Sequence, residues 1–207
     1  MASQDAPDTN PYVSRGGLKL AAALDSIGID PSGLVCADLG CSTGGYTDCL
    51  LQRGATRVYA VDTAYGELAW KLRNDSRVVV MERTNALHAD VPDDDTVSLV
   101  ALDLGWTKLS KAVPAAARWL TKGGVILPLI KPQYERPQEG GRNADRRTLT
   151  DEETETISFA CVEDLREMGY DAADPVACPI RGGAKKKGGK GGGNLEWLTV
   201  IRVPADS

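Results

Sequence analysis

Four polar residues at the ends of apolar segments could carry out acid–base chemistry in one cleft. Asp103 and Lys131 each follow an apolar run, Lys19 lies near the start of a predicted helix, and Glu196 begins the last apolar run. Carboxylates and amines gathered in a cleft alter one another's proton affinity, which is how active sites prepare acids and bases. Each residue alone would be interpreted as the solvated end of an element. Together, and beside a glycine-rich segment, they predict an active site.

That glycine-rich segment, Asp38-Leu-Gly-Cys-Ser-Thr-Gly-Gly-Tyr-Thr47, follows an apolar run and precedes a predicted helix. In an open α/β sheet, ligands bind where such a turn meets a helix N-terminus, and glycines let the backbone approach the ligand. Thr43 or Thr47 is available to cap the helix. The dinucleotide fingerprint is not matched, because no second glycine follows Gly40 at the required spacing. No lysine follows the glycines, as a nucleoside-triphosphate loop would need.

A second acidic residue, Asp62, directly follows the apolar run 57–61. A carboxylate at this place can accept hydrogen bonds from both hydroxyls of a ribose. With the glycine-rich segment, Asp62 predicts a cofactor that contains adenosine but no pyrophosphate, and S-adenosylmethionine fits this description best. The alternative is a glycine-rich turn that only connects a strand to a helix.

The composition is that of a soluble globular protein of one domain. The 207 residues are 42% hydrophobic and 26% charged. No segment approaches the ~20 apolar residues of a membrane span, and the polar, acidic N-terminus does not match a secretory signal. Five cysteines without a C-x-x-C pair predict buried thiols in the cytoplasm and no metal site. The single histidine, His88, is interpreted as solvated, and the net charge of −5 argues weakly against nucleic acid.

Apolar runs alternate with helical patterns along the chain. The predicted strands are 34–37, 58–61, 78–81, 97–102 and 125–130. The predicted helices are 17–27, 47–52, 67–73, 109–120 and a last one to about 168, capped by Thr150. We expect a disordered tail at 1–11, a long polar loop at 131–148 and an antiparallel hairpin of 175–180 with 195–203. The alternation predicts one α/β domain, 12–204, with a mostly parallel sheet covered on both faces.

Five motifs of this chain are similar to the TlyA family, which belongs to the FtsJ/RrmJ-like ribosomal RNA methyltransferases. They are Y-V-S-R-G-G-x-K-L from 12, D-x-G-x-S-T-G-G-Y-T-D-C-L-L-Q-R-G-A from 38, V-Y-A-V-D from 58, K-P-Q-Y-E from 131 and N-x-E-W from 194. The resemblance implies a Rossmann-like S-adenosylmethionine-dependent methyltransferase fold, with a seven-stranded, mostly parallel sheet and a C-terminal antiparallel hairpin strand. It also implies methyl transfer to a ribose 2′-hydroxyl, with ribosomal RNA or a ribosomal subunit as the partner.

The resemblance carries residue roles with it. The implied catalytic tetrad is Lys19, Asp103, Lys131 and Glu196. Lys131 would be the base, in a neutral form favoured by the cation Lys19 and by partial burial. Asp103 would orient Lys131 and the methyl group, and Glu196 would hold Lys19. The implied cofactor contacts are Asp38, Gly40, Ser42, Thr43, Gly44, Gly45, Tyr46, Asp62, Asn85 and Asp103.

The chain departs from the family at its beginning and in two loops. The usual TlyA chain starts with an S4-type RNA-binding domain, whereas this one starts almost at the catalytic domain, so RNA affinity is expected to come from elsewhere. Two basic loops are candidates, although each is as readily interpreted as a solvated linker. The expected RNA contacts are Arg15, Lys185, Lys186, Lys187 and Lys190. The other basic loop carries Arg136, Arg142, Arg146 and Arg147.

Three other functions compete with RNA methylation. A methyltransferase of a small hydroxylated molecule would explain the acidic net charge but leaves the basic loops without a role. A hemolysin, a label that relatives of this family have carried, is disfavoured by the lack of a signal sequence and of an apolar span. A non-catalytic cofactor-binding protein is disfavoured by the intact tetrad.

Overall fold

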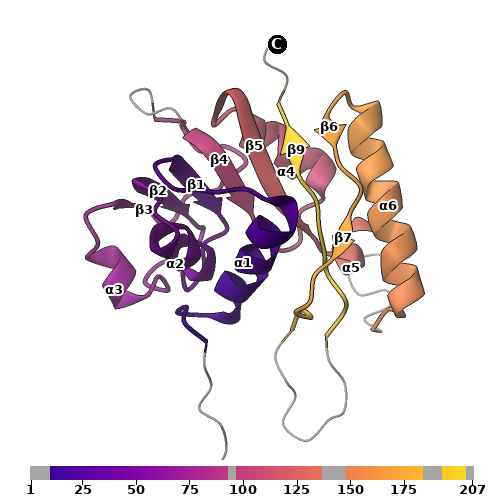
Figure 1. Cartoon of the computed structure of the whole chain (residues 1–207), viewed down its shortest axis with the longest axis horizontal. Coiled ribbons are helices and arrows are strands. Elements are labelled where there is room, and N and C mark those ends of the chain that lie inside the picture. The colour runs from indigo at the N-terminus through magenta and orange to yellow at the C-terminus, as the bar shows by residue number, and fades with distance from the viewer. Residues whose placement is uncertain (1–9, 93–96, 137–147, 184–192, 204–207) are drawn as a thin grey trace, which may run out of the picture.

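The computed structural model describes residues 10–92, 97–136, 148–183 and 193–203, and it shows an α/β sheet with helices on both faces (Figure 1). Five parallel strands form its larger part, in the order β3-β2-β1-β4-β5. They are β1 (Val35–Leu39), β2 (Arg57–Val61), β3 (Val78–Met81), β4 (Val97–Leu102) and β5 (Leu120–Ile130). All five were predicted as strands, and the parallel sheet is confirmed.

The register of these strands brings their carboxyl ends to one edge. Leu39 at the end of β1 pairs with Val61 of β2 on one side and with Leu102 of β4 on the other. The residues that directly follow these ends therefore lie side by side, because neighbouring parallel strands stop at the same level. In this chain those residues are the glycine-rich segment, Asp62 and Asp103.

The C-terminal part of the sheet is antiparallel and is made of short strands. One extended segment contains β6 (Asp171–Ala172) and β7 (Val176–Ala177), and the other contains β8 (Trp197–Leu198) and β9 (Ile201–Arg202). β8 lies between β5 and β7, and β9 pairs with β5 and β6. The expected hairpin pairing is confirmed. Among the described residues the sheet has nine strands rather than seven, because each of these two segments is divided into two short strands.

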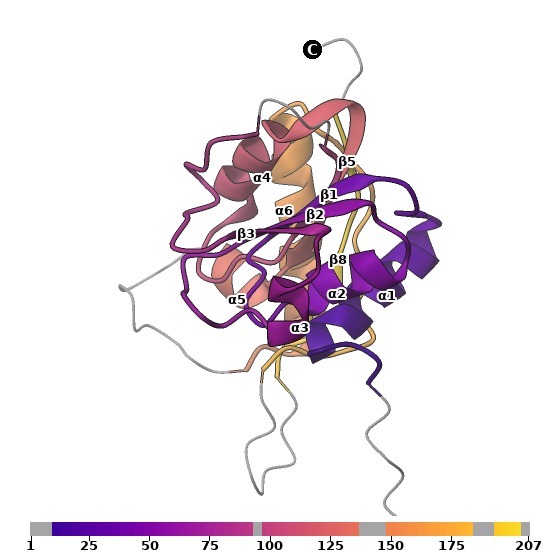
Figure 2. The same cartoon turned by 90° about the vertical axis from the view of Figure 1, so that its left-hand side faces the viewer.

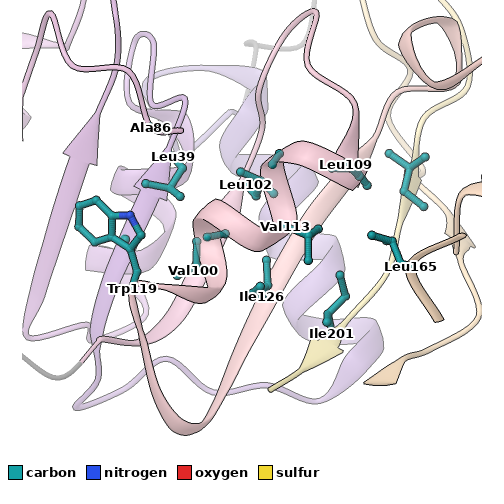
Figure 3. Packing of buried hydrophobic residues seen from close by; sticks show 14 of the residues in the cluster. Leu39, Ala86, Val100, Leu102, Leu109, Val113, Trp119, Ile126, Leu165 and Ile201 are labelled. Carbon is teal, nitrogen blue, oxygen red and sulfur yellow. The ribbon is translucent and has the colours of Figure 1, made fainter. Parts of the chain in front are cut away.

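Within the described residues, six helices cover the two faces of the sheet. They are α1 (Arg15–Ile27), α2 (Gly45–Gln52), α3 (Trp70–Arg73), α4 (Leu109–Ala117), α5 (Pro132–Glu135) and α6 (Asp151–Glu167). One buried cluster joins α1, α2 and α3 to the sheet, and a larger one joins α4 and α6 to its other face. Figure 2 shows the sheet between these two groups of helices. Figure 3 shows Val113 of α4 beside Ile126 of β5, with Leu165 of α6 further along the same cluster. Strands buried on both faces explain why they read as continuous apolar runs.

Several local predictions are corrected. The N-cap of α2 is Gly44 in a left-handed conformation, φ +96°, and neither Thr43 nor Thr47 caps it. Pro132–Glu135, expected within a long loop, form the short helix α5. α3 begins at Trp70, so the first residues of the predicted helix are not helical.

Other predictions at the chain's polar segments are confirmed or lie outside the described residues. Thr150 and Glu153 form a capping box at the start of α6, as predicted. Of the expected disordered tail, 1–9 lies outside the described residues, whereas the carbonyl of Pro11 accepts a hydrogen bond from Gln52 Nε2 at 3.0 Å. Asn10 Oδ1 also accepts a hydrogen bond, from the backbone N–H of Tyr12 at 3.1 Å.

The five cysteines are free and buried, as expected, and His88 is exposed. Among the residues that the structure describes, no group of three or more His, Cys, Asp or Glu side chains is arranged to hold a metal ion. None of the helices within those same residues is long and apolar enough to cross a membrane.

Candidate active site

Two adjoining pockets lie at the edge where the parallel strands end. One of about 270 Å³ lies against the first turn of α1 and contains Lys19 and Tyr46. The other, of about 320 Å³, lies between the segments that follow β2, β3 and β4 and contains Asp62 and Asn85. Gly40, Ser42 and Asp103 line both pockets. We call the two pockets together the trough. Its place is the one that the sequence predicted for the cofactor.

The glycine-rich segment forms the floor of the trough, and its glycines are sterically required. Gly40 has a φ of +97°, and a Cβ at this position would lie 2.6 Å from the backbone carbonyl oxygen of Asp103. Gly44 has a φ of +96°, and its Cβ would lie 2.3 Å from a methyl carbon of Leu72. A side chain at either place would strain the backbone and push the segment away from its neighbours. The close approach of the segment to Asp103 therefore depends on Gly40.

Asp38, which the sequence predicts to contact the cofactor, lies beneath this segment and does not line either pocket. Its Oδ2 accepts hydrogen bonds from the backbone N–H of Thr47 at 2.8 Å and from the Thr47 hydroxyl at 2.7 Å. Its Oδ1 is buried and has no hydrogen-bond partner among the described residues. Burial raises the pKa of this carboxyl to about 7. Asp38, at the end of β1, is thus linked by hydrogen bonds to the first turn of α2.

Asp62 lies at the other end of the trough and orders the turns around it. Its Oδ2 accepts the backbone N–H of Ser42 at 2.8 Å, and its Oδ1 accepts that of Ala64 at 2.8 Å. Each carboxylate oxygen can accept more than one hydrogen bond, so both still have capacity for a ligand hydroxyl. Asn85 lines the same pocket, and its Oδ1 accepts the backbone N–H of Leu87 at 3.0 Å.

The four residues of the expected tetrad meet as two ion pairs. Lys131 Nζ pairs with Asp103 Oδ1 where β5 and β4 end. Lys19 Nζ lies 2.5 Å from Glu196 Oε2, with side chains that are 12% and 4% exposed. Lys19 and Asp103 both line the 270 Å³ pocket. The structure therefore brings a cation and an anion into one pocket, and each is paired with an opposite charge.

Tyr46 lines the same pocket as Lys19 and Asp103. Its side chain is buried, and its hydroxyl has no hydrogen-bond partner among the described residues. Burial is the largest cause that raises the pKa of this phenol well above its usual range, and the charge of Asp103 adds to it. The hydroxyl is therefore kept as a neutral donor.

An aromatic pair beside the tetrad, in which one ring is exposed, was missed by the sequence-based search, which considered charged residues and glycines. Trp106, three residues after Asp103, is 82% exposed and has a φ of +63°. Its ring lies 4.8 Å from that of Tyr134, centroid to centroid, at 38°. The signal that could have revealed it is a tryptophan in a polar, glycine-containing segment immediately after a catalytic strand end.

The expected RNA contacts are only partly described. Arg15 lines the 270 Å³ pocket, and its guanidinium donates a hydrogen bond to the carbonyl of Gly183. Lys185, Lys186, Lys187 and Lys190 lie outside the described residues, as do Arg142, Arg146 and Arg147. The described residue that precedes the lysine-rich loop is thus attached to the helix that carries Lys19.

Comparisons with known proteins show which family the chain resembles. A profile of the FtsJ-like methyltransferases matches residues 12–160. The chain is 39% identical over 202 residues to YqxC of Bacillus subtilis, which is named as a candidate rRNA methyltransferase. The aligned stretch covers 94% of this chain and 67% of that protein. It is 37% identical over 198 residues to TlyA of Mycobacterium tuberculosis, named as a 16S/23S rRNA (cytidine-2′-O)-methyltransferase, with 94% and 70% of the two chains covered.

Solved structures show the same likeness in three dimensions. A candidate hemolysin from Streptococcus thermophilus is similar with a TM-score of 0.81 and 34% identity, over 98% of this chain and 70% of that one. Solved S-adenosylmethionine-dependent methyltransferases of much lower identity share the fold alone. With a family profile matched over more than half of its length, the chain belongs to the FtsJ-like methyltransferases.

Proposed function

We propose that this enzyme transfers a methyl group from S-adenosylmethionine to a ribose 2′-hydroxyl of ribosomal RNA. The observation that supports this most directly is the meeting of Lys19 and Asp103 in one pocket beside the glycine-rich segment. Their partners, Glu196 and Lys131, complete the set. A lysine next to a carboxylate at the open edge of a parallel sheet is suited to proton transfer beside a bound cofactor.

The trough fits S-adenosylmethionine in its shape and its polar groups. Gly40 and Ser42 join the two pockets, so an extended ligand can pass from one to the other over glycine backbone. Asp62 offers carboxylate oxygens to the ribose hydroxyls in one pocket. Asp103 and the neutral phenol of Tyr46 face the other, where a sulfonium and an amino acid group would lie. When bound, S-adenosylmethionine supplies a methyl group that is already activated by its positively charged sulfur.

Lys131 is suited to remove the proton of the attacking hydroxyl. A ribose hydroxyl is a poor nucleophile at neutral pH and needs a base in the transition state. The contact with Asp103 fixes the position of Lys131 Nζ where β5 and β4 end. In its neutral form this amine can accept the hydroxyl proton at Nζ, and Asp103 keeps it oriented.

The aromatic pair favours a nucleic acid over a small hydroxylated molecule. Trp106 is 82% exposed and stacked on Tyr134, one helical turn from Lys131. Base–aromatic stacking contributes about 1–3 kcal/mol per base. Unpaired bases that are presented to an enzyme are commonly stacked in this way. The names of the relatives YqxC and TlyA, which both specify rRNA, point in the same direction.

The test is transfer of labelled methyl groups from S-adenosylmethionine to 30S subunits, 50S subunits, total RNA and a small-molecule extract. We expect label in ribosomal RNA, in dinucleotides that resist alkaline hydrolysis because the 2′-oxygen is methylated. Lys131→Ala should lower the rate of labelling by about 10²–10⁴-fold. Lys122→Ala is the matched control, because Lys122 is an exposed lysine near the opposite end of the same strand, β5. Label on a base, or in the small-molecule fraction alone, would overturn the proposal.

A further inference from the structure

Helix α5 is joined to the segment between β4 and α4 by three successive contacts. Lys131 pairs with Asp103, the ring of Tyr134 lies on that of Trp106, and Glu135 Oε1 accepts the backbone N–H of Leu109 at 2.9 Å. The contacts follow the same order along both segments. The two segments are therefore held together over their length, from the catalytic ion pair to the start of α4.

Glu135 is the anchor of this arrangement. The first N–H groups of a helix need partners outside it, and Lys108, the N-cap residue of α4, makes no side-chain cap. Glu135 provides the missing acceptor from another helix, and its negative charge suits the helix N-terminus. Its carboxyl also contacts the thiol of Cys161 on α6. Burial raises the pKa of Glu135, as expected of a carboxyl enclosed between three helices.

The position of Lys131 depends on such an anchor. α5 has four residues, Pro132–Glu135, and a single turn of helix is not stable by itself in water. Its place is therefore set by the contacts it makes. Lys131 directly precedes α5, so a shift of the helix would move Nζ away from Asp103, which lines the trough. Misplacement of a reacting group by about 1 Å can cost on the order of 100-fold in rate.

We propose that Glu135 is a positioning residue for methyl transfer, which sets the place of Lys131 and of the Trp106–Tyr134 pair by capping α4 from α5. The expected effect on kcat rests on the proposed function, since it is measured with ribosomal RNA as the substrate. A merely stabilising Glu135 would affect unfolding but not the rate of the folded enzyme. Cofactor affinity separates a positioning role from a merely stabilising one. Of the proposed cofactor contacts, all but Asp103 lie outside the segment between β4 and α4, and the glycine-rich segment and Asp62 belong to the connections after β1 and β2.

The experiment compares Glu135→Ala, Glu135→Gln and Glu155→Ala, the last being an exposed carboxylate on α6 as the matched control. We expect Glu135→Ala to lower kcat with ribosomal RNA about tenfold or more, with an unchanged Kd for S-adenosylmethionine. Glu135→Gln keeps an oxygen that can accept the Leu109 N–H, so it should retain kcat within about threefold of wild type. Glu155→Ala should match wild type in both respects.

Hydrogen exchange provides a readout that does not depend on the substrate. In Glu135→Ala, residues 103–109 and 131–136 should exchange faster, while 38–47 should not change. Unchanged exchange in both of the first two segments would overturn the inference, as would a kcat equal to that of Glu155→Ala. Loss of kcat together with loss of cofactor binding would also overturn it, because the effect would then be on the whole fold. If wild type labels no RNA, the proposed function fails, and the exchange experiment still decides the role of Glu135.

Discussion

Lys19 and Glu196 form a buried ion pair although 177 positions separate them in the chain. The carboxylate is enclosed from its other side by Gly182, where a Cβ would lie 2.1 Å from Glu196 Oε1. The pair connects α1 to the segment that precedes β8. It therefore fixes one wall of the proposed active site to the antiparallel end of the sheet.

Removing one member of this pair should destabilise the protein strongly. Lys19→Met leaves the carboxylate of Glu196 buried without its cation, and such a loss costs about 3–5 kcal/mol. The double variant Lys19→Met/Glu196→Gln should recover a large part of this, because no buried charge remains. Urea unfolding of the two single variants and the double variant gives the coupling energy. Additive free energies would show that the pair contributes nothing beyond its separate side chains.

Lys131 should be required for the chemical step but not for cofactor binding. Lys131→Ala should lower kcat by about 10²–10⁴-fold, the usual contribution of a positioned acid or base. Lys131→Arg should not restore activity, because a guanidinium stays protonated and cannot accept the hydroxyl proton. Single-turnover kinetics and calorimetric titration with S-adenosylmethionine measure the two effects separately. An active Arg variant would mean that the side chain contributes only positive charge.

Asp62 should determine cofactor affinity. Asp62→Ala removes the proposed ribose contact and also the acceptor for the N–H groups of Ser42 and Ala64. We expect a loss of roughly 1.5–3 kcal/mol, the size of a hydrogen bond to a charged group. Asp62→Asn keeps one acceptor oxygen and should lose less. Calorimetry with S-adenosylmethionine and with its demethylated product is the measurement, and equal affinity of wild type and the Ala variant would refute the assignment.

Asp38 should make stability fall as the pH rises. Its pKa is raised to about 7 by burial, so the folded state holds a proton that the unfolded state releases near pH 4. This contribution is fully present below about pH 4 and is lost as the pH rises through about 7. Asp38→Asn keeps an acceptor for Thr47 and does not titrate. The free energy of unfolding of this variant should therefore rise by roughly 2 kcal/mol relative to that of wild type between pH 5 and pH 8. If the free energies of unfolding of the two proteins changed in parallel over this range, the expectation would be contradicted.

The lysine-rich loop should contribute to RNA affinity through charge alone. Lys185, Lys186, Lys187 and Lys190 lie outside the described residues, but Gly183, which precedes them, accepts a hydrogen bond from Arg15 at the 270 Å³ pocket. Each phosphate contact adds roughly 0.7–0.9 to the salt dependence of binding, so changing all four lysines to Ser should flatten the slope by about 2–4. RNA binding over a salt series measures this, with cofactor affinity as the control. Identical slopes would identify the loop as a linker.

The parallel half of the fold and the grouping of the site were predictable because they follow from local patterns. Continuous apolar runs mark strands buried on both faces, and parallel strands place Asp62, Asp103 and Lys131 at one edge. The direction in which a side chain at a strand end points depends on tertiary contacts and not on the neighbouring residues in the sequence. Asp38 has the same sequence context as a cofactor ligand, yet it faces the start of α2, where Thr47 provides two donors.

Features that depend on tertiary contacts could not be predicted in the same way. α5 is four residues long and begins with a proline, and its polar sequence resembles a loop. What makes it a helix is its packing against the segment after β4, through Tyr134 and Glu135. Likewise, the left-handed conformation of Trp106 is unusual for a large side chain, and it accompanies the contact of its ring with Tyr134.

The antiparallel placement of β8 between β5 and β7 has a consequence for biosynthesis. Domains fold as units while the chain emerges from the ribosome, with the N-terminal part first. When α6 has been made, the glycine-rich segment, Asp103 and Lys131 all exist, but Lys19 has no carboxylate partner, because Glu196 follows some 30 residues later. The proposed catalytic set is therefore complete only after the segment that carries Glu196 has been made and has paired beside β5.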